Sequence, residues 1–240
     1  MKQLKLIFDD NLESFDRFIE KAKIHIPGTG VTHFKLFDFQ KRLVEYCESY
    51  DYVIGSKFRQ GGFDMTLLFY GLWKALHGEN DVVIVCPFLR MVCDLHDRME
   101  AIIDYLPEEF QSCIGKSIDL SFKLSNGNSI SFYHRTDECY GLSPNSTIIL
   151  IEAAYCKNLD LAPFYGAGKI IIISSLTPNE TDFEKLLKRA IRGLNMYKVY
   201  TCHYTEFPLF QNQEYMDELK LNMGRKFWER EIEQKLTKNH

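Results

Sequence analysis

GSKFRQGGFDMTLL, residues 55–68, lies between an apolar run typical of a buried strand, YDYVI at 50–54, and a segment with the apolar spacing of a helix. At such a junction the backbone N–H groups of a glycine loop and the positive end of the helix converge and can hold an anion. The stretch therefore predicts a phosphate-binding loop. The alternative is that a glycine pair between a strand and a helix is ordinary chain geometry.

The side chains of this loop depart from the standard phosphate-binding sequence. That sequence has four residues between two glycines, followed by Lys and then Ser or Thr, whereas Phe63 and Asp64 follow the glycine pair here. At roughly 4 Å from a phosphate charge, the Asp64 carboxylate would cost up to about 4 kcal/mol at an effective dielectric near 20. Asp64 is equally a candidate N-cap of the helix. Thr66 can replace the missing hydroxyl only with a shift of two residues.

The remaining strands indicate a parallel sheet. The runs DVVIVCP (81–87), STIILIEAAY (146–155) and GKIIIISSL (168–176) are nearly continuous in apolar residues, which is typical of strands covered on both faces. A hairpin is predicted around Asn126-Gly127, and YKVYTCHYT (197–205) is a further strand. Together these elements predict an α/β fold of the P-loop NTPase type, a mainly parallel sheet flanked by helices with an added β-hairpin.

Helices are predicted between these strands and at both ends of the chain. Apolar residues recur at helical spacing over 10–24, 38–49, 64–78, 88–106, 180–194 and parts of 213–238. Accordingly, we expect a helical lead-in over 1–30, a core over 31–208 and a helical tail over 209–240.

Composition and charge exclude several classes of protein. A net charge of −4 gives no overall attraction to nucleic acid or to an anionic membrane. The seven cysteines are scattered and none has metal-knuckle spacing, which indicates reduced thiols. We expect an intracellular protein, because the first residues do not resemble a signal peptide and no apolar run is long enough to cross a bilayer. No metal site is predicted, and His96 with Asp94 and Asp97 is interpreted as part of a solvated helix.

Four motifs occur in the order expected of an ATPase core: FKLFDFQ (34–40), KFRQGG (57–62), the acidic end of IILIEAAY (148–155) and SSLTPN (174–179). Over residues 26–180 this series resembles the ATPase domain of phage terminase large subunits. YLPEEF (105–110) ahead of the hairpin adds to the resemblance. The resemblance implies ATP and Mg²⁺ as cofactors, packaging, capsid or portal proteins and double-stranded DNA as partners, and the host cytoplasm or the virion as the location.

The resemblance also implies roles for individual residues. Gln40 corresponds to the glutamine that contacts adenine, and an amide suits the adenine edge because it both donates and accepts. Lys57 and Arg59 correspond to phosphate-binding cations of members whose lysine precedes the glycines. Glu152 corresponds to the glutamate that polarises the attacking water. The nucleotide-binding candidates are Gln40, Lys57, Arg59, Gln60, Gly61, Gly62 and Thr66, and the coupling candidates are Thr177 and Asn179.

The sequence departs from the family pattern at catalytic positions. Phe63 replaces the usual lysine, Asp64 the metal-binding hydroxyl, and Ile151 the metal-holding aspartate. With the alignment shifted by one residue, Glu152 would hold the metal and Ala153 would replace the base. Because phosphoryl transfer depends on positioning and on neutralisation of charge by metal, we expect a rate lower by several orders of magnitude. ATP and Mg²⁺ binding is therefore expected to be weak or absent.

Three functions follow from this interpretation. The favoured one is a terminase-derived, catalytically weakened protein that acts as a structural or interaction module in phage packaging or particle assembly. The second is an active ATP-hydrolysing packaging motor that uses Lys57 or Arg59 on the phosphates. The third is a helicase-like nucleotide-binding fragment. The resemblance implies a nuclease domain after the ATPase core, and we expect none within these 240 residues.

Overall fold

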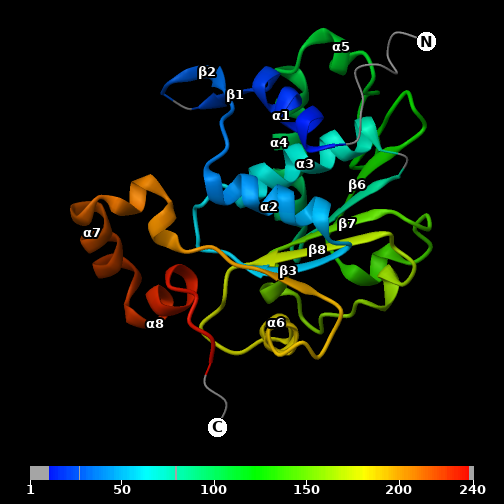
Figure 1. The fold of residues 1–240 in the computed structure, drawn as a ribbon. Coiled ribbons are helices and arrows are strands. Elements are labelled where there is room, and N and C mark those ends of the chain that lie inside the picture. The colour runs from blue at the N-terminus through cyan, green and yellow to red at the C-terminus, as the bar shows by residue number, and fades with distance from the viewer. Residues whose placement is uncertain (1–10, 27, 79, 238–240) are drawn as a thin grey trace.

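The structure, a computed structural model, describes residues 11–26, 28–78 and 80–237 (Figure 1). Residues 1–10 of the predicted lead-in lie outside this range. The centre is a seven-stranded sheet with the order β5-β6-β4-β7-β8-β3-β9, in which all neighbours are parallel except β5 and β6. Its strands are β3 (Tyr52–Ser56), β4 (Val82–Val85), β5 (Ser121–Lys123), β6 (Ser129–Tyr133), β7 (Thr147–Ile151), β8 (Lys169–Ser174) and β9 (Lys198–Tyr200).

The predicted hairpin is confirmed, and it is part of the main sheet. β5 and β6 pair in antiparallel register, with Ser121 opposite Ser131. β6 then pairs with β4 in parallel, with Val82 opposite Ile130. Residues between the two strands are held by Asn128, whose side-chain amide donates to the carbonyl of Ala75 at 2.9 Å. The hairpin thus extends the sheet instead of lying outside it.

Helices cover both faces of the sheet, as the apolar strands predict (Figure 1). Successive residues of β8 point to opposite faces, because side chains alternate along a strand. Ile171 and Ile173 belong to the larger core cluster, and Ile170 and Ile172 to the smaller one with Phe183 of α6. The helices are α1 (Leu12–Lys21), α2 (Asp38–Ser49), α3 (Phe63–His77), α4 (Leu89–Asp104), α5 (Glu108–Gln111) and α6 (Asp182–Ile191).

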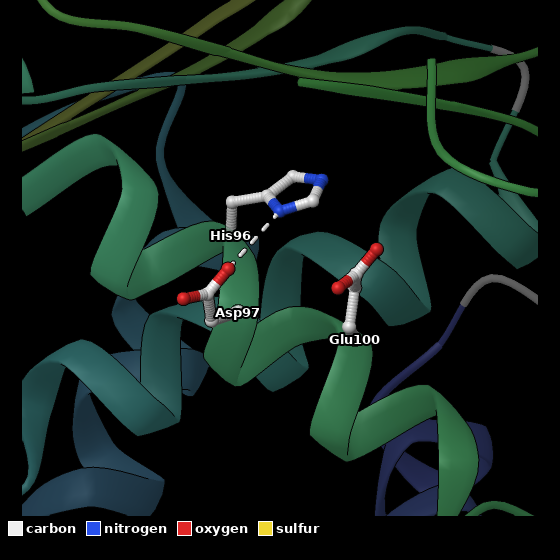
Figure 2. A group of neighbouring side chains, drawn as sticks. All are labelled: His96, Asp97 and Glu100. Atoms are coloured by element: carbon white, nitrogen blue, oxygen red, sulfur yellow. Dashed lines mark ion pairs between the residues drawn. The ribbon is translucent and has the colours of Figure 1, made fainter. Parts of the chain in front are cut away.

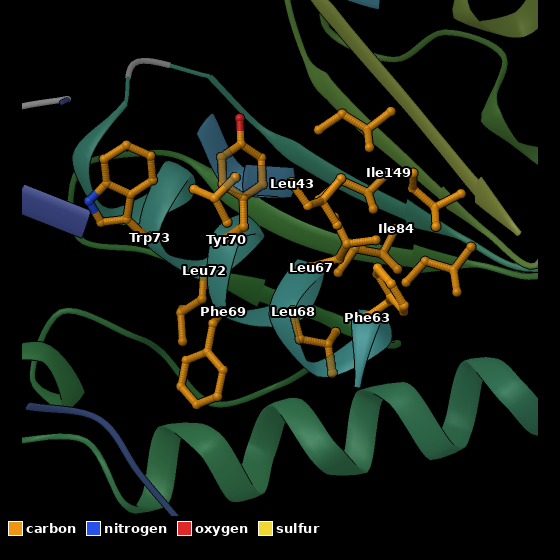
Figure 3. Close-up of a cluster of buried hydrophobic side chains, with 14 of the residues drawn as sticks. Leu43, Phe63, Leu67, Leu68, Phe69, Tyr70, Leu72, Trp73, Ile84 and Ile149 are labelled. Atoms are coloured by element: carbon orange, nitrogen blue, oxygen red, sulfur yellow. The ribbon is translucent and has the colours of Figure 1, made fainter. Parts of the chain in front are cut away.

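Helix α3 is the central element of the larger core (Figure 3). Its residues from Thr66 to Trp73 are all buried, because the sheet lies on one side and other helices lie on the other. Gly71 permits the close approach to the sheet, since a Cβ there would lie 3.2 Å from side-chain atoms of Ile149 and Val82. This burial fixes the first turn of α3, which follows the glycine pair directly.

Two features at the ends of the chain complete the fold. A small antiparallel sheet of β1 (Lys23–Ile26) and β2 (Gly30–His33) was not anticipated, because its strands are only four residues long and are mostly exposed. The expected tail helices are α7 (Gln213–Met223) and α8 (Arg225–Phe227), followed by a π-helix over Trp228–Ile232. Within the described part of the chain, no helix combines the length and apolar character needed to span a bilayer.

Candidate functional site

The glycine loop, residues 57–62, joins the end of β3 to the start of α3. The Lys57 N–H donates to the carbonyl of Ser174 at 2.9 Å, which continues the β3–β8 pairing by one residue. Gly62 has φ +70° and is the N-cap of α3. A Cβ on Gly61 would lie 2.5 Å from the Phe63 ring, and one on Gly62 would lie 2.7 Å from Gln40 Nε2. Packing therefore favours glycine at position 61, and the left-handed backbone favours glycine at position 62.

An ion triad of Lys57, Asp64 and Glu152 lies beside this loop. Lys57 Nζ is 2.5 Å from Glu152 Oε1 and 3.3 Å from Asp64 Oδ1. The lysine is only 5% exposed. Burial alone lowers the pKa of Lys57, but the attraction of Asp64 and Glu152 exceeds that effect and the pKa lies above its usual value. The lysine is therefore a buried ammonium between two carboxylates.

Asp64 is not the N-cap of α3, which corrects one alternative from the sequence. It is the second residue of the helix, after Phe63, and the cap is Gly62. In the first turn a carboxylate is favoured by the positive end of the helix. Its side chain is directed to Lys57 instead of to a backbone N–H of the helix end. Asp64 therefore belongs to the ion triad.

Glu152 is held in place from both sides. Its backbone has φ +58°, a left-handed conformation that is uncommon for a residue with a side chain, and its N–H donates to the carbonyl of Ile173 at 2.9 Å. Its Oε2 accepts from Ser174 Oγ at 3.3 Å and from Ser175 Oγ at 3.2 Å. Motif spacing predicted no contact of these two serines with Glu152. Their place at the end of the strand next to β7 is the signal that could have found it.

A cavity of about 490 Å³ opens at the ion triad. Six of the residues predicted from the sequence line it: Lys57, Arg59, Gln60, Gly61, Gly62 and Glu152. The rest of the lining consists of Phe63, Asp64, Met65, Phe88, Met91, Arg98, Tyr155 and Ser175. The other predicted residues, Gln40, Thr66, Thr177 and Asn179, do not line it. The loop, the ion triad and the start of α3 thus meet in one concave site, as the order of motifs indicated.

Two residues that were predicted to bind nucleotide, Gln40 and Thr66, form hydrogen bonds within the protein instead. Gln40 is buried, accepts from the Phe37 N–H at 2.9 Å and donates to the carbonyl of Gly61 at 2.8 Å. Thr66 is fully buried, and its hydroxyl donates to the carbonyl of Gly62 at 3.1 Å. In this arrangement both side chains support the loop from behind.

Arg59, the second residue predicted to bind phosphate, pairs with the C-terminal segment, residues 225–237. Its Nη1 lies 2.6 Å from Oε2 of Glu231, and its N–H donates to the Glu231 carbonyl at 3.0 Å. Glu231 is only 1% exposed. Nearby, Ser56 Oγ donates to Gln234 Oε1 at 2.7 Å. The π-helix therefore covers one side of the glycine loop.

The same C-terminal segment is bonded to the predicted coupling residues. Arg230 Nε donates to the carbonyl of Thr177 at 2.7 Å, and Lys226 Nζ to Asn179 Oδ1 at 3.3 Å. Thr177 Oγ1 also donates to the carbonyl of Asn179 at 2.7 Å. Arg230 in turn forms a buried ion pair with Glu184 of α6. The loop after β8 and the glycine loop are thus tied to one segment.

Every cation that lines the cavity is paired with a carboxylate of the protein, and the ion triad has one ammonium for two carboxylates. Three cations line the cavity: Lys57 is paired within the ion triad, Arg59 with Glu231, and Arg98 with Asp94 at 2.8 Å. Backbone N–H groups of the loop and the start of α3 fit a phosphate. A magnesium ion fits less well, because both carboxylates face Lys57 and the Thr66 hydroxyl bonds to the backbone.

Comparison with known proteins gives the class of fold. No model of a protein family matches the sequence. The large terminase of bacteriophage HK97 has a TM-score of 0.71 at 14% identity, covering 92% of this chain and 54% of that one. The large terminase ATPase domain of Thermus phage P74-26 has a TM-score of 0.63 at 14% identity, covering 85% and 95%. The large terminase of a thermophilic bacteriophage, in complex with ADP, has a TM-score of 0.59 at 11% identity, covering 82% and 52%.

The fold is therefore the P-loop NTPase-like fold of phage large terminase ATPase domains, which confirms the class predicted from the sequence. This chain spans about half the length of the HK97 large terminase and of the ADP-bound large terminase that it matches. At 11–14% identity the likeness establishes the fold.

Proposed function

We propose that this chain derives from a DNA-packaging ATPase, that its hydrolytic activity is weakened, and that it acts as a structural or interaction module of phage packaging or particle assembly. The observation that carries the proposal is the position of Lys57, whose ammonium is buried between Asp64 and Glu152. The glycine loop keeps the position of a phosphate-binding loop, while the side chains beside it pair with one another and leave one negative charge in excess.

The ion triad opposes hydrolysis in two ways. A phosphate that uses Lys57 has to compete with two carboxylates that already hold it, and Asp64 adds a like charge where the phosphate would lie. Glu152 is also occupied, because its two oxygens accept from Lys57 and from the two serines at the end of β8. A carboxylate used in this way is poorly placed to orient water. Both effects favour weak ATP and Mg²⁺ binding.

The active motor is the second candidate, and one observation favours it. Lys57 follows β3 directly and lies in the same cavity as Glu152 and both loop glycines, where a lysine that precedes the glycines could reach a phosphate. In that case Lys57 would leave the carboxylates when nucleotide binds. Glu152 would then be free to orient the attacking water, as the family resemblance implies.

Phosphate release separates the two candidates. The purified chain is assayed with ATP and Mg²⁺ beside Glu152→Gln and a matched control, Glu45→Gln, which changes an exposed glutamate on α2. We expect release near background in all three proteins. Magnesium-dependent hydrolysis that Glu152→Gln abolishes and Glu45→Gln retains would replace the proposal with the active motor.

The interaction role is tested by binding. Portal, capsid and terminase subunits and double-stranded DNA are the partner classes we propose, in the host cytoplasm or the virion. Each protein class is mixed with the chain and analysed by size-exclusion chromatography, and DNA binding is followed by fluorescence anisotropy at two salt concentrations. We expect a stable complex with a packaging or particle protein that does not depend on ATP. Failure of every such mixture would remove the module role.

A further inference from the structure

Helix α4 carries a second cluster of chemically active side chains, on His96, Asp97 and Glu100 (Figure 2). We propose that these three residues form a binding site for a divalent transition-metal ion, with Zn²⁺ as the preferred ion. The sequence had assigned His96 to a solvated helix surface. The proposal is independent of any ATPase activity, because none of the three residues lines the cavity at the glycine loop.

The helix places the three ligands together. His96 and Glu100 are four residues apart and so share one face of α4, and Asp97 is adjacent. Ligand atoms of the three side chains lie within 4.8 Å of one another. Zinc binds nitrogen and oxygen ligands at about 2.0–2.2 Å, which needs only small rotations of the two exposed carboxylates. The third ligand, the imidazole, is already fixed.

The His96 ring is fixed by its packing and by one hydrogen bond. The residue is only 7% exposed, and the ring stacks on Phe122 at a centroid distance of 4.9 Å. Nε2 lies 2.6 Å from Ser117 Oγ. When Nε2 carries the proton and donates to Ser117, Nδ1 keeps its lone pair, the form in which histidine binds metal. A serine in this position therefore acts as the outer partner of a metal ligand.

The second ring nitrogen has no hydrogen-bond partner among the described residues. Nδ1 lies 3.7 Å from Asp97 Oδ1, which is beyond hydrogen-bond distance. The dashed line in Figure 2 marks this ion-pair contact. A largely buried histidine whose ring lies beside two carboxylates is the arrangement that a cation would complete. This observation distinguishes the cluster from an ordinary group of surface acids.

The carboxylates are not neutralised by the protein. Among the described residues, neither Asp97 nor Glu100 forms an ion pair with a lysine or an arginine. The nearest arginine along the helix, Arg98, is paired with Asp94 at 2.8 Å. Two negative charges and one imidazole suit a borderline ion such as Zn²⁺ or Co²⁺ better than a hard ion such as Ca²⁺, which prefers oxygen alone.

The test is titration of the full chain with Zn²⁺ and, separately, with Mn²⁺. Mn²⁺ is included because the exposed thiol of Cys93 on the same helix could bind zinc but is a poor ligand for manganese. We expect one equivalent of either ion to bind and to raise the melting temperature, because an ion that binds only the folded state stabilises it. In ¹⁵N-histidine spectra of the zinc complex, the Nδ1 resonance of His96 should shift.

Matched variants decide the assignment. Asp97→Asn and Glu100→Gln should each weaken binding at least about ten-fold, and Ser117→Ala should weaken it by a similar factor through the ring orientation. Asp94→Asn, which removes a carboxylate of the same helix outside the cluster, and Cys93→Ser should leave binding unchanged. Absence of saturable Zn²⁺ binding in the titration would overturn the proposal. So would unchanged binding in the Asp97→Asn/Glu100→Gln double variant.

Discussion

Lys57 Nζ lies 2.5 Å from Glu152 Oε1, which joins the residue after β3 to the residue after β7. Both residues directly follow the carboxyl ends of parallel strands, which is where α/β proteins bind ligands. The Lys57 ammonium offsets one of the two negative charges of Glu152 and Asp64. The site therefore combines a glycine loop at the end of a parallel strand with charged side chains that pair with one another.

The first prediction concerns Asp64. Replacing it with Asn removes a negative charge from the mouth of the glycine loop and leaves Lys57 with one carboxylate partner. A charge about 4 Å from a phosphate is worth up to about 4 kcal/mol at an effective dielectric near 20, so we expect ADP and ATP to bind at least about ten-fold more tightly. Calorimetric titration measures this change. The control is Asp182→Asn, in the first turn of α6, which should have no effect. Unchanged affinity in Asp64→Asn would mean that nucleotide phosphates do not approach this residue.

The second prediction concerns the C-terminal segment. Glu231→Gln removes the carboxylate that pairs with Arg59, while the backbone contact between the two residues remains. Arg59 is then available to an anion in the cavity, and we expect phosphate or ADP affinity to rise several-fold. Because the Arg59 side chain is 59% exposed, the loss of the pair itself should cost about 1 kcal/mol or less in stability.

The neighbouring pair supplies the control for this experiment. Glu229→Gln removes a more exposed carboxylate of the same helical segment, which pairs with Arg225 at 3.0 Å. We expect it to leave anion affinity unchanged. Equal effects of the two substitutions would show that overall charge, and not release of Arg59, is responsible.

The third prediction concerns pH. Burial raises the pKa of Glu184, but hydrogen bonds from Arg230 and Thr237 lower it by a larger amount. The net pKa is therefore below its ordinary value of 4.5. A carboxylate whose pKa is lower in the folded state stabilises the fold above about pH 4.5, and this stabilisation is lost as the pH falls through the folded-state pKa. We expect the C-terminal segment to detach in this acid range, as followed by fluorescence of Trp228, which it contains.

The variant Glu184→Gln tests the source of this pH dependence. It leaves the Arg230 guanidinium buried without its charged partner, which should cost about 3 kcal/mol at neutral pH. It should also flatten the acid transition. Asp182→Asn, exposed on the same helix, should change neither. An acid transition of the same size in Glu184→Gln would assign the effect to another group.

The sequence predicted the fold because the main strands and helices carry strong local patterns. The continuous apolar runs at 147–151 and 169–174 require cover on both faces, and α2 begins at Asp38 as its spacing indicated. The β1–β2 hairpin was missed because its strands are only four residues long, too short for their alternation to stand out. The hairpin partner of β4 also depends on a parallel pairing between distant segments, and no local signal specifies it.

The site was predicted in part. Lys57, Arg59, the loop glycines and Glu152 do meet in one cavity, because their positions at strand ends and in the loop fix where they lie. The partners of these residues could not be predicted. Glu231 is 172 residues from Arg59 in the chain, and the Lys57–Glu152 contact spans 95 residues. Pairings of this kind depend on tertiary packing, which propensity and motif spacing do not encode.

The final prediction concerns Gln40, whose proposed contact with adenine remains a prediction. In the structure its amide joins the Phe37 N–H to the carbonyl of Gly61. Gln40→Ala leaves these buried groups unsatisfied and should cost about 1–3 kcal/mol in the free energy of unfolding, measured by urea denaturation. The control is Lys41→Ala, an exposed neighbour on α2, which should change stability by less than about 0.5 kcal/mol.

An adenine contact would in addition make ATP bind more tightly than GTP in the Asp64→Asn background, and Gln40→Ala would remove that difference. If Gln40→Ala lowers stability and leaves the ratio of ATP affinity to GTP affinity unchanged, the glutamine supports the loop and does not contact the base.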